Sequence, residues 1–133
     1  MESPARVPIR SDADVVLARA QGRLLAAELG FSSTDATVIA TAVSEVARNI
    51  VQHAGRGELQ FDTVRDRDRV GIRITARDNG PGISDIDEAL RPGYSTASSL
   101  GLGLPGAKRL MDEFEIHSEL GQGTQVTMTK WGS

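Results

Sequence analysis

Apolar residues recur with a helical period in one long segment of the chain. Between residues 35 and 52, Ile39, Val43, Val46 and Ile50 follow one another at spacings of three or four. This spacing places all four on one face of an amphipathic helix. The segment therefore predicts a helix over 35–52 that packs this face into the core, and residues 32–34 (Ser-Ser-Thr) offer its N-cap.

A second helical pattern precedes this one. Ser11 or Asp12 can cap a helix that runs through Leu29, and Gly30 stands where a left-handed residue commonly ends a helix. We expect the buried side of this first helix to carry Val16, Leu17, Ala20, Leu24 and Ala27.

Alternating apolar and polar residues predict strands in much of the remaining chain. In residues 69–78, Val70, Ile72, Ile74 and Ala76 alternate with polar side chains, and residues 58–64 alternate in the same way. The turn Asp66-Arg67-Asp68 joins these two strands into a hairpin. Shorter strands are predicted over 6–10, where Pro8 suits a sheet edge, and over 115–119 and 124–131.

A last helix is predicted over 104–114, and one or two helical turns over 85–90. The inward residues of the last helix are expected to be Leu104, Ala107, Leu110 and Met111. The resulting order, β-α-α-β-β-loop-α-β-β, has no internal repeat or linker. It predicts an α+β, two-layer sandwich formed by a single domain over 1–133, with helices on one face of a mixed, mostly antiparallel sheet.

Composition excludes several classes of protein. The 133 residues contain no cysteine, which excludes a disulfide framework, a thiolate metal site and a cysteine nucleophile. The net charge of −3 comes from interspersed signs, whereas a nucleic-acid binder would need a basic stripe. No apolar run reaches membrane-spanning length and the first residues lack a signal-peptide pattern. We therefore expect a cytoplasmic protein that binds neither nucleic acid nor a membrane.

Two polar residues stand out on the helix predicted over 35–52. Glu45 and Asn49 are four residues apart, so they share a face that is turned about 100° from the apolar stripe. Taken alone, an acid and an amide on a helix are most simply a solvated surface. They gain a functional meaning only if other segments direct polar groups toward the same side.

Three glycine-rich turns are candidates for such segments. Asp78-Asn79-Gly80-Pro81-Gly82-Ile83 follows the most regular strand, and it is either an ordinary strand-ending turn or a site where the backbone approaches a ligand. Gly101-Leu102-Gly103-Leu104-Pro105-Gly106 opens a helix without a preceding strand, so it is no Rossmann fingerprint; a plain loop and a phosphate-binding helix start both remain open. Gly121-Gln122-Gly123-Thr124 is a hairpin turn.

Together, these features resemble a known group of nucleotide-binding proteins. The Glu45–Asn49 pair and the three glycine turns occur in the order found in the GHKL (Bergerat-fold) superfamily. That superfamily includes histidine-kinase catalytic domains, type II topoisomerase ATPase domains and bacterial anti-sigma-factor serine kinases. Each motif alone is weak, but four of them in register along the whole chain are specific.

The resemblance implies a role for each matching residue. Asn49 would ligate the Mg²⁺ that bridges the phosphates of ATP, and Glu45 would be the general base. Asp78 would accept a hydrogen bond from the adenine amino group, and Thr124 would close the adenine pocket. The other implied nucleotide contacts are Gly80, Gly82, Ile83, Gly101, Leu102, Gly103 and Leu104, with residues 91–100 as the lid.

Within the superfamily, the chain is most similar to RsbT-type switch kinases of bacterial stress signalling. The shared stretches are SEVARNIVQHAGRG, ARDNGPGISDID, GYSTASSLGLGLPGAKRLMDEFEIHS and a final TKW. This family implies phosphorylation of serine or threonine on STAS-domain proteins of the stressosome, followed by binding to a PP2C-type phosphatase regulator. A base at Glu45 is consistent with a hydroxyl substrate.

Two alternatives remain open from the sequence. One is an RsbW-type anti-sigma-factor kinase, which would bind a sigma factor directly. The other is a non-catalytic interaction module that keeps the Bergerat site only as a scaffold.

Overall fold

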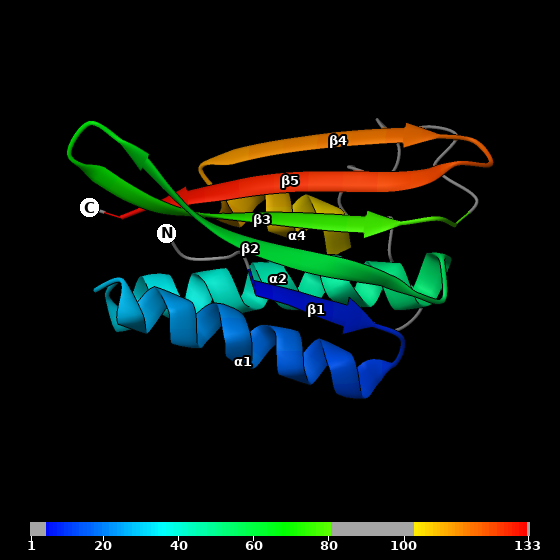
Figure 1. Ribbon diagram of the computed structural model, residues 1–133, viewed down its shortest axis with the longest axis horizontal. Helices are drawn as coiled ribbons and strands as arrows, with labels where there is room; N and C mark the ends of the chain where they lie inside the picture. The colour runs from blue at the N-terminus through cyan, green and yellow to red at the C-terminus, as the bar shows by residue number, and fades with distance from the viewer. Residues whose placement is uncertain (1–4, 81–102, 133) are drawn as a thin grey trace.

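The computed structural model describes residues 5–80 and 103–132, in which five strands form one sheet and the helices lie along one of its faces (Figure 1). The strands are β1 (Ala5–Ile9), β2 (Gly57–Asp66), β3 (Arg69–Asp78), β4 (Glu113–Glu119) and β5 (Gly123–Trp131). The helices are α1 (Asp12–Glu28), α2 (Ser33–His53) and α4 (Gly103–Leu110). The two-layer α+β prediction is confirmed.

The strands are arranged in the order β1-β2-β3-β5-β4. All four pairings are antiparallel. The described part of the sheet is therefore wholly antiparallel, whereas a mixed, mostly antiparallel sheet was expected. β1 lies at one edge, as predicted from Pro8, whose missing N–H is tolerated there. The helical turns predicted over 85–90 lie outside the described residues.

The core lies between α2 and the sheet. Ile39, Val43, Val46 and Ile50 are at most 2% exposed, which confirms the apolar stripe predicted for this helix. They meet the apolar side of the β2–β3 hairpin, whose buried residues include Leu59, Phe61, Ile72 and Ile74. The predicted N-cap is also present, because the Ser32 hydroxyl accepts a 3.1 Å hydrogen bond from the Asp35 N–H.

The predicted buried face of α1 is wrong. Val16, Leu17 and Leu24 are 66%, 61% and 55% exposed, and Ala20 and Ala27 are exposed as well. The helix instead buries the opposite side, which carries Val15, Ala18, Gly22 and Ala26. Ser11 occupies the N-cap position, but its side chain makes no capping hydrogen bond.

Small residues explain why α1 turns this side inward. A Cβ at Gly22 would lie 3.1 Å from the Val43 side chain and 3.4 Å from that of Phe61. The absence of a side chain at Gly22 therefore allows α1 to approach α2 and the sheet closely. The leucine-bearing side could not make this approach, because each larger side chain would hold the helices further apart.

The last helix is shorter than predicted. α4 ends at Leu110, and the Asp112 N–H already donates to the Thr129 carbonyl of β5 at 3.0 Å. Phe114, predicted as helical, belongs to β4 and pairs with Met128. The predicted inward residues Leu104, Ala107 and Met111 are buried, and Leu110 is half-buried.

Candidate functional site

One row of polar side chains lies at the end of the apolar face of the sheet. Across β3, β5 and β4, the register aligns Ile74 with Met128 and Phe114, and next Ala76 with Val126 and Ile116. The following row consists of Asp78, Thr124 and Ser118. Because side chains alternate along a strand, this row lies on the same face as the two apolar rows, the face that the helices cover. The core thus ends in three hydrogen-bonding side chains at one end of the sheet.

Hydrogen bonds hold this row in place. The Ser118 and Thr124 hydroxyl oxygens are 2.8 Å apart, and Ser118 also donates to the Gly123 carbonyl at 3.1 Å. Thr124 is 7% exposed, whereas Asp78 is half-buried. The Asp78 carboxylate accepts a 2.9 Å hydrogen bond from the Gly80 N–H, which fixes the start of the turn and leaves other acceptor positions on this side chain.

Two glycines allow the backbone to reach this arrangement. Gly123 has φ +104°, and a Cβ there would lie 2.1 Å from the Asp78 carbonyl oxygen. A Cβ at Gly80 would lie 2.6 Å from the Cβ of Ala54, the C-cap residue of α2. The turn after β3 therefore packs directly against the end of α2 and brings Asp78 close to that helix.

Glu45 and Asn49 lie further back on α2. They precede Ala54 by about two and a half turns and one and a half turns, respectively. Glu45 is 7% exposed and accepts a 2.9 Å hydrogen bond from Arg48, while Asn49 is half-buried. Glu45 is therefore not a solvated surface acid, but a buried carboxylate whose charge is balanced by a neighbouring guanidinium.

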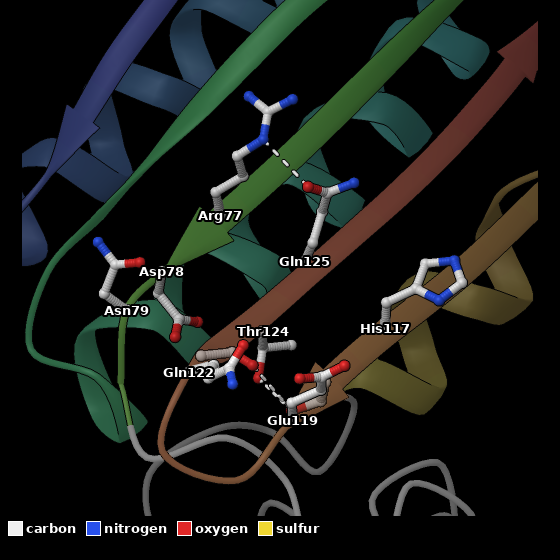
Figure 2. Close-up of a pocket in the computed structure, with 10 residues that line it drawn as sticks. Arg77, Asp78, Asn79, His117, Glu119, Gln122, Thr124 and Gln125 are labelled. Carbon is white, nitrogen blue, oxygen red and sulfur yellow. Dashed lines mark hydrogen bonds between the residues drawn. The ribbon is translucent and has the colours of Figure 1, made fainter.

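A pocket of about 310 Å³ opens at the end of the sheet, among the ends of β3, β4 and β5. Figure 2 shows Asp78 and Thr124 at this end, with Arg77, Gln125 and His117 extending over the strands. Arg77 donates to Gln125 at 3.1 Å on the helix-free face. Glu45 and Asn49 are not among the described residues that line this pocket.

The remaining predicted contacts divide between described and undescribed positions. Gly103 and Leu104 form the buried start of α4, where backbone N–H groups are free of intrahelical partners. α4 packs against α2, so this helix start and Asn49 belong to neighbouring elements. Gly82, Ile83, Gly101, Leu102 and the expected lid over 91–100 lie outside the described residues.

Two residues of the site were not predicted from the sequence. Ser118 has the same strand parity as Phe114 and Ile116, so its inward orientation could have been read from the alternation; its position beside Thr124 required the register. Arg48 follows Glu45 by three residues, a spacing at which helical side chains meet, so its ion pair with Glu45 could have been predicted.

The described residues contain no group of three or more His, Cys, Asp or Glu side chains that could hold a metal ion. None of the helices in the described ranges is long and apolar enough to cross a membrane.

Residues 10–130 match the family model described as the histidine kinase-like ATPase domain. The chain belongs to the histidine kinase-like ATPase family. The fold agrees, because the structure of a mycobacterial sensor histidine kinase, MprB, superposes with a TM-score of 0.53 over 98% of both chains at 16% identity. At this identity the superposition supports the fold alone.

The chain is similar to two kinds of protein, a serine/threonine-protein kinase and anti-sigma F factors. The serine/threonine-protein kinase RsbT of Bacillus subtilis is 47% identical over 98% of both chains. The anti-sigma F factor of Caldanaerobacter subterraneus is 33% identical over 80% of this chain and 77% of its own length. The anti-sigma F factor of Oceanobacillus iheyensis is 39% identical over 71% of this chain and 68% of its own. The predictions of a GHKL fold, an RsbT-type chain and a protein serine/threonine kinase are confirmed.

Proposed function

We propose that residues 1–133 form one ATP- and Mg²⁺-dependent kinase domain that phosphorylates serine or threonine on STAS-domain partners. After release from these substrates, the kinase would bind a PP2C-type phosphatase regulator in the cytoplasm. The observation that carries the proposal is the buried Glu45 carboxylate one turn before Asn49, in a chain 47% identical to RsbT. A kinase that acts on a hydroxyl needs a base close to the phosphates, and Glu45 is the acidic side chain held inside the fold on this helix.

The adenine end of the proposed site is the polar row. The Asp78 carboxylate keeps acceptor capacity beyond its bond to Gly80, so it can accept from the exocyclic amine of adenine. Thr124, held by Ser118, would lie at the side of the ring. Gly80 and Gly82 would let the backbone approach the base without an intervening Cβ, and Ile83 would contact the nucleotide beside them.

The phosphate end is assigned to α2 and to the start of α4. Gly101, Leu102, Gly103 and Leu104 would direct backbone N–H groups toward the β- and γ-phosphates, which the helix dipole also favours. The donor set fits Mg²⁺, because the half-buried Asn49 amide offers a hard oxygen ligand and phosphate oxygens and waters can complete the shell. When bound, Mg²⁺ would neutralise negative charge on the phosphates of ATP as the γ-phosphoryl group is transferred.

Phosphoryl transfer would then depend on positioning and a single proton transfer. Glu45 accepts the proton of the partner's serine or threonine hydroxyl as the oxygen attacks the γ-phosphate, and ADP leaves. Arg48 holds the Glu45 carboxylate in one orientation before the hydroxyl arrives. Most of the rate enhancement would come from alignment of the hydroxyl with the γ-phosphate, because both groups are already ordered by binding when the reaction begins.

The direct test is incubation with labelled ATP, Mg²⁺ and purified STAS-domain protein, followed by detection of phosphoserine or phosphothreonine. We expect transfer by the wild type and at least a hundredfold slower transfer by Glu45→Ala, the order of magnitude a general base contributes. Nucleotide affinity of Glu45→Ala should stay near the wild-type value, whereas Asn49→Ala should weaken Mg-ATP binding. Transfer by Glu45→Ala at the wild-type rate would show that the base is assigned wrongly.

A second candidate rests on the two anti-sigma F factors named above, which are 33% and 39% identical to the chain. It is an RsbW-type kinase that binds a sigma factor directly. A pull-down with purified sigma factor, with and without Mg-ATP, separates this candidate from the first. Calorimetry with Mg-ATP separates both from a non-catalytic interaction module, which would show no nucleotide binding.

A further inference from the structure

The sheet has two edge strands, β1 and β4, which differ in how well they are protected against the addition of a further strand (Figure 1). β1 spans five residues and contains Pro8, which has no N–H to donate to a neighbouring strand. β4 spans seven residues, contains no proline and pairs with β5 at every position from Glu113 to Glu119. Its other side pairs with no strand of the described residues. β4 therefore presents a continuous row of backbone donors and acceptors.

The helix-facing side of β4 is apolar but incompletely covered. Phe114 lies beside Met128 of β5, and Ile116 lies beside Val126, so two apolar rows of the sheet end on β4. Met128 and Val126 are buried, whereas Phe114 and Ile116 are only half-buried. A strand added to β4 could continue both rows with its own apolar side chains and remove more of these two residues from water.

The other side of β4 is acidic. Glu113, Glu115 and Glu119 are exposed on the helix-free face, where they alternate in sequence with the apolar residues. Their register partners on β5 are two threonines and a glycine, so no positive charge lies opposite them. Within the described residues, the only basic group within 4 Å of these carboxylates is His117, whose Nε2 is 3.8 Å from Glu115. The negative charge of this row is therefore not balanced by lysine or arginine of the described chain.

These charges argue against a second copy of β4 as the added strand. In an antiparallel pair of β4 strands that continues the sheet, the two rows of glutamates would share the helix-free face, with three carboxylates from each strand. Like charges directly opposite each other destabilise a strand pair, and charged residues on an edge strand commonly prevent self-association. The same row would attract a strand that carries lysine or arginine at alternate positions.

We propose that the free edge of β4 binds an extended segment of a partner protein in which Lys or Arg alternates with apolar residues. The basic side chains of this segment would lie about 5 Å from Glu113 and Glu115, and its apolar side chains would cover Phe114 and Ile116 on the other face. Ser118 is the only β4 residue with a part in the proposed nucleotide site. The binding of this segment therefore does not depend on the proposed kinase activity.

Two labelled peptides of seven residues, the length of β4, test the proposal by fluorescence anisotropy with the whole chain. Both alternate Val or Ile with a charged residue, which is Lys in one peptide and Glu in the other. We expect the Lys peptide to bind at least about tenfold more tightly than the Glu peptide, and to bind more weakly at about 0.5 M salt. The double variant Glu115→Lys/Glu119→Lys should reverse this preference.

A backbone-methylated form of the Lys peptide separates strand addition from a purely ionic contact. Methyl groups on its backbone nitrogens leave the charge unchanged but remove the N–H donors that a strand pair requires. We expect this peptide to bind at least about tenfold more weakly than its parent. Binding of the parent peptide should also slow hydrogen exchange of the backbone amides of residues 113–119 at least about tenfold.

Glu28→Lys/Asp68→Lys is the matched control for the charge reversal. It changes the net charge by the same amount at two exposed positions outside β4, one at the end of α1 and one in the β2–β3 turn. This control should keep the preference for the Lys peptide. Melting temperatures equal to that of the wild type would show that both double variants are folded.

Several results would overturn the proposal. Equal affinity for the Lys and Glu peptides, binding of neither, or full affinity of the methylated peptide would each do so. A preference that Glu115→Lys/Glu119→Lys leaves unchanged, or protection from exchange only outside residues 113–119, would place the peptide elsewhere on the molecule. A wild-type dimer in sedimentation in which the amides of residues 113–119 are protected would assign the edge to a second copy.

Discussion

The carboxylate of Glu45 accepts a 2.9 Å hydrogen bond from the guanidinium of Arg48, three residues further along α2. The Glu45 side chain is 8% exposed and that of Arg48 is 35% exposed, so the pair joins the buried side of the helix to its surface. The arginine both balances the buried charge and limits the orientations of the carboxylate. Several consequences of this contact and of the polar row can be measured.

Replacement of Arg48 should impair transfer more than nucleotide binding. Without the guanidinium, the Glu45 carboxylate loses its fixed orientation, and we expect Arg48→Ala to lower kcat about tenfold while the KM for ATP changes less than twofold. The free energy of unfolding should fall by only about 1 kcal/mol, because Arg48 is partly exposed and solvent screens the pair. Steady-state phosphorylation and urea denaturation give these values.

Arg48→Lys is the matched control for this prediction. Lysine keeps the positive charge but lacks the planar fork of arginine, so it should recover part of the lost rate. A rise in KM for ATP with unchanged kcat would instead indicate that Arg48 contacts the nucleotide.

Asp78→Asn should weaken ATP binding without disrupting the turn. The asparagine side-chain oxygen can still accept from the Gly80 N–H, so the fold should persist, but the charged acceptor for the adenine amine is lost. A hydrogen bond to a charged group contributes about 1.5–3 kcal/mol, so Kd for Mg-ATP should rise about ten- to hundredfold in calorimetry. An unchanged Kd would remove Asp78 from the adenine site.

Ser118→Ala should act through Thr124. It removes the 2.8 Å contact with the Thr124 hydroxyl and the bond to the Gly123 carbonyl, each worth about 1 kcal/mol. We expect Kd for Mg-ATP to rise about three- to tenfold, with the transfer rate at saturating ATP retained. Ser118→Thr, which keeps the hydroxyl, should restore affinity; failure of this rescue together with a lowered kcat would contradict a positioning role.

Gly123→Ala should destabilise the fold far more than Gly121→Ala. Both glycines have positive φ, +104° and +79°, so a side chain at either position is strained by about 1 kcal/mol. At Gly121 nothing lies within 4 Å of the new Cβ, whereas at Gly123 the Cβ would meet the Asp78 carbonyl at 2.1 Å. We expect a loss of about 3 kcal/mol or more for Gly123→Ala in urea denaturation. Equal losses for the two variants would show that the hairpin end can shift away from Asp78.

The sequence alone was sufficient for the elements with a single strong period. The stripe on α2 and the alternation in β2 and β3 each have one apolar face, and a helix or strand with one apolar face has one way to bury it. The motifs that point to ATP were recognisable because their glycines and polar residues are local in sequence. The family to which the chain belongs could therefore be predicted before the fold was known.

Three features required the tertiary structure. α1 has apolar residues on two opposite sides, and periodicity cannot decide which side meets the core. Close approach through Gly22 selected the side with small residues and left Leu17 and Leu24 exposed. α4 ends at Leu110 because the Asp112 N–H is bonded to a β5 carbonyl distant in sequence. The polar row likewise exists only through strand register, which aligns Asp78, Thr124 and Ser118 from three separate segments. Local sequence determines which faces can be buried, but contacts between distant segments decide which of them are.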